Sequence, residues 1–169
     1  MKKVIIISII LILLSPIMMA QTLSYTGVVS TKDTSITEDE LYSRGVLWVS
    51  ETFKSPGDVI KMSDKENGII QGSGSIKYKH GGFSAYLTGH ITFIFKLYLK
   101  KAKYKYEFSN FIHYGYNDAW SYGLVNDGDC NKAGFGKHIV DIKSAINSEV
   151  TTMLKSLETA MNQGVNSNW

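Results

Sequence analysis

The chain has 169 residues, of which 44% are hydrophobic and 20% are charged, and its formal net charge at neutral pH is +3. This length suits one ordinary domain with a hydrophobic core of its own. The charge is too small to indicate a protein that binds nucleic acid. The single cysteine cannot form an internal disulfide, so the core must hold without one.

The first twenty residues have the layout of a secretory signal peptide. Lys2 and Lys3 give a positive start, a nearly unbroken apolar run follows to Met19, and Ala20 is a small residue where cleavage can occur. We therefore expect export through the inner membrane, with residues 21–169 as one mature domain that is periplasmic or secreted. Without the leader, 16 basic and 15 acidic residues remain, which is close to neutrality.

A membrane anchor is the alternative role for this leader. A transmembrane helix needs about 20 apolar residues, whereas this run is shorter and is interrupted by Ser15 and Pro16. A lipoprotein would need a cysteine after the cleavage point, where Gln21 stands instead. A cleaved leader that leaves no membrane anchor is therefore the favoured interpretation.

The mature chain begins with a strand and a helix. Alternating residues predict the strand from Leu23 to Val29. Thr37 can cap the helix, and Glu40 follows three residues later, as in a capping box. The wide apolar stripe that follows predicts a helix lying on a sheet, ending at Ser55-Pro56-Gly57. Gly45 lowers helix propensity, which a close approach of helix to sheet would explain.

Four more strands are predicted, at 59–63, 69–78, 90–99 and 104–108. Gly72 and Gly74 leave gaps on one face of the second of them, which we expect an aromatic residue of the helix to fill. His80-Gly81-Gly82 is predicted to turn the chain, and residues 100–103 are predicted to reverse it without a glycine. The last two strands then form a long hairpin.

A loop and a helix complete the chain. Gly115 to Gly136 is rich in aromatic residues and glycine, which predicts a loop that is long for a compact domain. Apolar residues from Ile139 to Met161 recur every three or four residues, which predicts a long amphipathic helix. The order β-α-β-β-β-β-α predicts a single α+β domain, with a five-stranded antiparallel sheet and two helices on one face. The opposite face would be open or covered by a partner.

Several segments also carry a family resemblance. They are Tyr42-Ser43-Arg44 with Trp48, the run 59–74, the strand 103–106 and Asn110-Phe111. On these residues the chain resembles the bacterial domain-of-unknown-function 4468 family, which has a TATA-binding-protein-like (TBP-like) fold. The resemblance implies the same order of elements and transfers no catalytic residue. The fold name does not imply DNA binding, because that function depends on side chains rather than topology.

No motif identifies a reaction, a cofactor or a metal. No histidine pair has helical spacing for zinc. His90, on the outer face of its predicted strand, is the histidine best placed to meet a ligand. Asp127-Gly128-Asp129 is rich in oxygen but lacks the further ligands of a calcium loop, so we interpret it as a turn. Cys130 has no base beside it in the sequence.

The candidate binding surface is the open sheet face together with the aromatic loop. It comprises Lys96, Tyr98, Lys103, Lys105, Tyr116, Trp120 and Tyr122. Tyrosine and tryptophan are favoured at binding surfaces, although the loop could instead fold back and bury its rings. The lysines could bind an acidic partner or anionic lipid, but protection of an exposed strand edge is the interpretation that we favour.

These observations predict a non-catalytic binding or interaction module of the cell envelope. Its partner would be an envelope protein or a small ligand, and a homo-oligomer is compatible with an open sheet face. A hydrolase-type enzyme with scattered catalytic residues and a structural envelope subunit are the alternatives. A cleft with a buried ionisable group would favour the enzyme, and a large apolar patch would favour the subunit.

Overall fold

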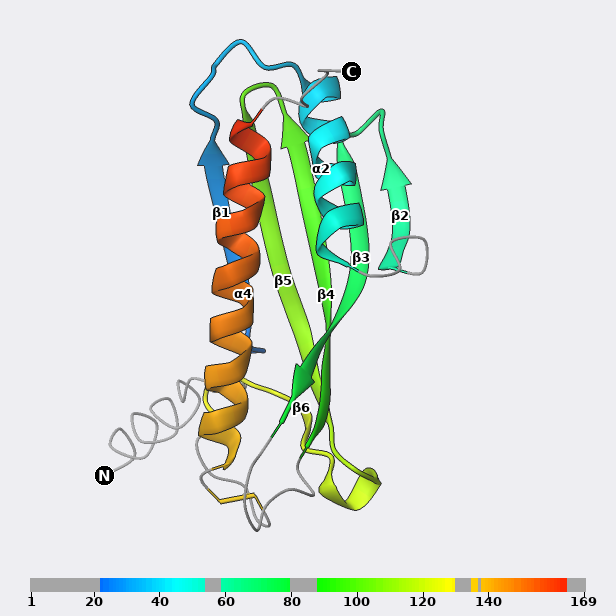
Figure 1. Cartoon of the computed structure of the whole chain (residues 1–169), viewed down its shortest axis with the longest axis vertical. Coiled ribbons are helices and arrows are strands. Elements are labelled where there is room, and N and C mark those ends of the chain that lie inside the picture. Colours follow the sequence, from blue (N-terminus) through cyan, green and yellow to red (C-terminus); the bar gives the residue numbers. More distant parts are fainter. Residues whose placement is uncertain (1–21, 54–58, 80–87, 130–134, 137, 164–169) are drawn as a thin grey trace, which may run out of the picture.

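Two helices cover one face of an antiparallel sheet in the computed structural model of this chain (Figure 1). The structure describes residues 22–53, 59–79, 88–129, 135–136 and 138–163. The strands are β1 (Tyr25–Ser30), β2 (Ile60–Asp64), β3 (Ile69–Tyr78), β4 (Gly89–Lys100), β5 (Lys103–Tyr114) and β6 (Gly123–Leu124). The helices are α2 (Glu38–Thr52) and α4 (His138–Asn162), with a 3-10 turn η2 (Asp118–Trp120).

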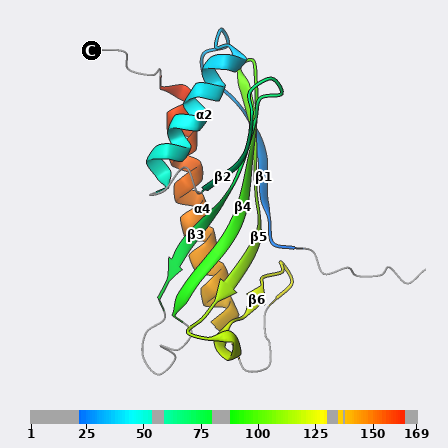
Figure 2. The same cartoon turned by 90° about the vertical axis from the view of Figure 1, so that its right-hand side faces the viewer.

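The strand order is β1-β5-β4-β3-β2, and the short β6 pairs with the end of β5. Figure 2 shows both helices on the same side of the sheet, which confirms the predicted fold class. The signal peptide, Cys130 and the turns predicted at 55–57 and 80–82 lie outside the described residues. No helix in the described part of the chain combines the length and apolarity needed to cross a bilayer.

The start of α2 follows from its sequence. Thr37 accepts a hydrogen bond from the Glu40 backbone N–H at 3.2 Å, which confirms the predicted cap. A Cβ atom on Gly45 would lie 3.0 Å from Ile70 Cδ1 and 3.2 Å from Leu99 Cδ1. This confirms the close approach of helix to sheet at Gly45.

The β4–β5 hairpin contains one bulge. β5 continues beyond it and is therefore longer than the sequence predicted. The pairing register shifts between Thr92 and Ile94, opposite Asn110, whose φ is +57°. Phe108 and Phe111 are consequently both fully buried, although they are three residues apart. The strict alternation ends at this bulge, and for that reason the strand was predicted to end at Phe108. The reversal without glycine is confirmed, with Ala102 at a φ of +58°.

Aromatic rings fill the space that two glycines leave on β3. A Cβ atom on Gly72 would lie 2.5 Å from Phe95 Cζ, and one on Gly74 would lie 2.3 Å from Phe93 Cζ and 2.8 Å from Phe53 Cε1. Phe53, directly after α2, stacks on Phe95 with ring centroids 5.3 Å apart. The gaps are thus filled chiefly by Phe93 and Phe95 of β4, which the sequence did not predict, and the expected contribution from the helix is limited to Phe53 directly after it.

Two buried tyrosines should make the domain sensitive to alkali. Burial, together with the carboxylates of Asp141 and Glu158, raises the pKa of Tyr78 and of Tyr104 to about 12. The unfolded chain loses these protons near pH 10, so the free energy of unfolding should fall between about pH 10 and 12 and be unaffected below. Ultraviolet absorbance should show late tyrosinate formation, and Tyr104→Phe should weaken the pH dependence. An unchanged dependence would contradict this assignment.

Candidate binding groove between the helices and the sheet

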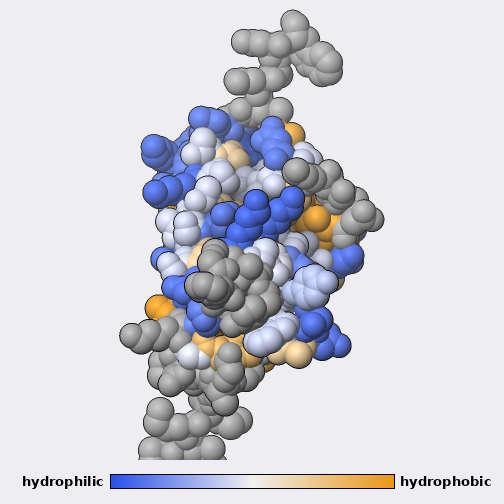
Figure 3. All heavy atoms as spheres, turned by 60° about the horizontal axis from the view of Figure 1, so that its bottom comes forward, coloured by the Kyte–Doolittle hydropathy of each residue, from blue (hydrophilic) through white to orange (hydrophobic). Residues whose placement is uncertain are grey.

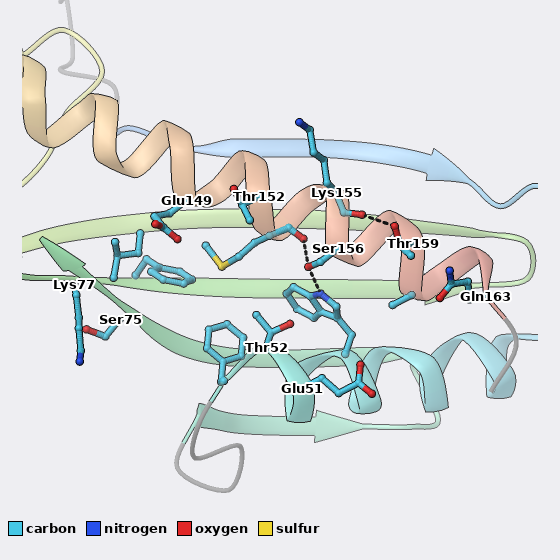
Figure 4. Close-up of a pocket in the computed structure, with 16 residues that line it drawn as sticks. Glu51, Thr52, Ser75, Lys77, Glu149, Thr152, Lys155, Ser156, Thr159 and Gln163 are labelled. Atoms are coloured by element: carbon cyan, nitrogen blue, oxygen red, sulfur yellow. Dashed lines mark hydrogen bonds between the residues drawn. The ribbon is translucent and has the colours of Figure 1, made fainter. Parts of the chain in front are cut away.

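A groove of ≈ 880 Å³ lies between α2 and α4, with β3 and β4 beneath it (Figure 4). Its floor is apolar and consists of Phe53, Ile76, Phe93 and Met153, beside Trp48. Its rim carries hydroxyl, amide and charged side chains: Glu51, Thr52, Ser75, Lys77, Glu149, Thr152, Lys155, Ser156, Thr159 and Gln163. The groove therefore combines an apolar surface with many hydrogen-bonding groups.

One hydrogen bond joins the two helices inside the groove. The indole Nε1–H of Trp48 donates to Ser156 Oγ at 2.9 Å, and the Ser156 hydroxyl donates to the Met153 carbonyl at 2.9 Å. Trp48 is 2% exposed, and its ring meets Phe53 and Phe95 edge to face. The Trp48 indole is therefore held in one position, with its polar atom satisfied by α4.

A buried arginine joins the same helices nearer the carboxyl end of α4. Arg44 is 5% exposed, and its Nη1 donates to the Met161 carbonyl at 2.6 Å. Its Nη2 pairs with the carboxylate of Glu40, one turn earlier on α2. Figure 4 shows the two helices converging toward this end of α4. A cation here also suits the negative end of the helix dipole.

The chemistry of the rim suits binding. Its charges are of both signs, with Glu51 and Glu149 against Lys77 and Lys155. No histidine or cysteine is among the residues that line it. Across the described residues, no three His, Cys, Asp or Glu side chains are grouped so that they could hold a metal ion. The groove can thus offer apolar contact, hydrogen bonds and charge pairing to a ligand.

Part of the surface predicted from the sequence forms one cluster on the open sheet face. Lys105 Nζ lies 2.6 Å from Glu107 Oε1 and 5.1 Å from the centre of the Tyr98 ring. The hydrogen bond from Lys105 lowers the pKa of Glu107. Lys96 lies opposite Glu107 in the pairing of β4 with β5. Glu107 thereby offsets part of the positive charge of this cluster.

The predicted surface is divided between two distant places. Lys103 begins β5, whereas the aromatic loop follows its end, so about 35–40 Å of strand separates them. In the loop, Tyr116 is 82% exposed and Trp120 is half-buried. Tyr122 is 4% exposed, and its ring packs edge to face on Phe135, so it adds no surface. The loop therefore buries some of its rings and exposes others.

The favoured interpretation of the lysines was wrong. β4 and β5 are interior strands, each flanked on both sides by other strands. Lys96, Lys103 and Lys105 thus project from the open face of the sheet and do not protect a strand edge. The edge strands of the sheet are β1 and β2, and the sequence alone did not predict this.

The other candidate residues have structural surroundings of their own. His90 is exposed on β4 and stacks on Tyr114, with ring centroids 5.0 Å apart. In the Asp127–Asp129 turn, both carbonyl oxygens at its ends accept hydrogen bonds from Lys143. These bonds tie the turn to α4.

The end of the molecule that carries η2 and β6 has no large hydrophobic surface on the side that Figure 3 shows. Hydrophilic side chains dominate this view, and hydrophobic residues form small separate areas between them.

Comparison with known proteins places this architecture in a family. The sequence profile described as "Domain of unknown function (DUF4468) with TBP-like fold" matches residues 25–114. The chain belongs to this DUF4468 family. No protein among those with curated functions matches it.

Two solved structures share the fold. A TBP-like protein from Parabacteroides distasonis is similar with a TM-score of 0.68 and 17% identity, over 87% of this chain and 97% of that one. A DUF4468 family protein from Bacteroides ovatus is similar with a TM-score of 0.66 and 15% identity, over 86% of this chain and 89% of that one. At these identities the likeness shows the fold alone. The family matches the resemblance seen in the sequence.

Sequence reasoning missed the residues of the groove. Thr152, Ser156 and Thr159 lie on the polar side of α4, which periodicity assigns to solvent. The accumulation of hydroxyl side chains over residues 151–159 was the one signal that distinguished this side from an ordinary charged helix surface. The sequence predicted both helices on one face of the sheet, but it did not indicate that this side of α4 would face α2.

Proposed function

We propose that this DUF4468 protein is an exported, non-catalytic binding module of the cell envelope, with its ligand in the α2–α4 groove. The observation that carries the proposal is the apolar floor of Ile76, Phe93 and Met153 beneath a rim of hydroxyl and charged groups. The volume of the groove lies within the range of small-molecule sites. The surface predicted from the sequence is divided between the open sheet face and the aromatic loop, so it suits one compact ligand less well than the groove does.

The composition of the groove specifies the chemical class of ligand. An amphipathic molecule with an apolar body can lie on the floor, and its polar groups can reach the hydroxyls of Thr52 and Thr152. Charged residues also line the groove, with Lys77 and Lys155 beside Glu51 and Glu149, so a ligand with a charged group can bind there. Anilinonaphthalene sulfonate has both properties, and its fluorescence rises in apolar surroundings, so it serves as a probe.

Filling the groove should weaken binding of this probe. Thr152 is exposed and lines the groove, so Thr152→Trp should place a ring over the floor and weaken binding about tenfold or more. Thr151, the next residue along α4, is also exposed but does not line the groove. Thr151→Trp is therefore the matched control and should bind as the unchanged protein does. Equal binding by both variants would contradict the proposed site.

The export part of the proposal has its own test. The leader at residues 1–20 supports passage through the inner membrane. Amino-terminal sequencing of the protein from the periplasm or medium should begin at or near Gln21. Recovery in the cytosol with the leader intact would contradict export and would leave the groove assignment to be judged by the probe alone.

A further inference from the structure

The outer edge of β1 lacks the features that usually keep sheet edges apart. No strand among the described residues pairs with that edge, because β1 ends the strand order. The ten residues from Thr22 to Thr31 contain no charge and no proline. The pairing of β1 with β5 also runs without a register shift. Such an edge is a template for another strand.

The opposite edge of the sheet is built differently. β2 has five residues, of which Lys61 and Asp64 are charged. Its pairing with β3 shifts register between Ile60 and Met62. Charge, short length and an irregular backbone all oppose edge-to-edge pairing. The contrast within one sheet marks β1 as the edge that can accept a partner.

Exposed apolar side chains and a hollow of mixed lining lie beside β1. Val28 is 68% exposed on the open face, and Val140 of α4 is 54% exposed near the start of β1. A hollow of ≈ 480 Å³ lies between this part of β1 and α4, lined by Leu23, Ser24, Tyr25, Asp127, Val140, Lys143, Ser144 and Asn147. A strand added to the edge would have room there for its side chains, as in other cases of strand addition.

We propose that two copies of the protein associate by antiparallel pairing of their β1 strands, forming one continuous sheet across a two-fold axis. β1 is itself extended and uncharged, so a second copy supplies the strand that this edge requires. Two such edges meet without like-charge repulsion, and the axis brings each Val28 toward the β1 of the other copy. Two-fold pairing also closes the assembly at two subunits. Figure 1 shows β1 at the margin of the sheet.

A charge on this edge should separate the two copies. Val28 lies opposite Lys105 within the subunit, so Val28→Glu adds a carboxylate that its own sheet tolerates. Across the two-fold axis two carboxylates would approach each other, and the dimer should dissociate at least about tenfold more readily. Met62→Glu, on the β2 edge, is the matched control because Met62 is also exposed, at 43%.

Sedimentation velocity over a range of protein concentrations measures the association, and circular dichroism verifies that each variant is folded. The expected result is a dimer for the unchanged protein and for Met62→Glu, and a monomer for Val28→Glu. Hydrogen exchange should also slow at β1 amides as concentration rises. A monomer for the unchanged protein at all concentrations, or a dimer that Val28→Glu leaves intact, would overturn the proposal. Neither outcome bears on probe binding in the groove.

Discussion

Gly74→Val is expected to lower the free energy of unfolding by about 3 kcal/mol or more. A Cβ atom at this position would lie 2.3 Å from Phe93 Cζ and 2.8 Å from Phe53 Cε1. Neither ring can move away freely. Phe93 is 2% exposed and stacks on Phe111, and Phe53 stacks on Phe95. The added side chain must therefore displace a closely packed ring layer between the sheet and the end of α2.

The control for this change lies one residue away. Ser73 faces the open side of the same strand, so Ser73→Val should alter stability by no more than about 0.5 kcal/mol. Urea unfolding followed by circular dichroism measures both variants. Phe53 and Phe93 also line the groove, so the Gly74 variant, where folded, should bind anilinonaphthalene sulfonate less well. Similar stability for the two variants would show that the rings yield easily.

Local signals predicted much of this fold because their causes are local. The Thr37 cap and the bounds of β3 depend on residues adjacent in sequence, and both are confirmed. The bulge at Asn110 was not predicted, because a positive φ at one asparagine leaves no periodic signal. Strand order was equally inaccessible, and for that reason the lysines of β4 and β5 were assigned to an edge.

The candidate groove depends entirely on contacts between distant segments. Trp48 and Ser156 share a hydrogen bond although they lie 108 positions apart. In the sequence, Arg44 is one polar residue within an amphipathic helix, yet it is buried, with its Nη1 bound to the Met161 carbonyl and its Nη2 to the Glu40 carboxylate. A single sequence gives the apolar stripes of both helices but not how they lie beside each other. Their spacing creates the groove, so its position could not be predicted.

Arg44→Ala is expected to lower the free energy of unfolding by about 2–3 kcal/mol. The change removes the donor that satisfies the Met161 carbonyl in the last turn of α4, where helix carbonyls have no partner within the helix. It also removes the aliphatic part of a side chain that packs between the two helices. The loss is smaller than for a fully buried ion pair, because the Glu40 side chain is 45% exposed and can be solvated.

Three variants separate the roles of charge, packing and hydrogen bonding. Arg44→Met keeps most of the volume and should cost about 1 kcal/mol, the expected effect of losing the bond to Met161. Glu40→Gln should cost less than about 1 kcal/mol, since its carboxylate is half exposed. Hydrogen exchange in the last turn of α4 should accelerate for Arg44→Ala and for Arg44→Met but not for Glu40→Gln. If exchange there is the same in all three, the arginine does not hold α4 against α2, and the closed end of the groove must depend on the Trp48–Ser156 bond instead.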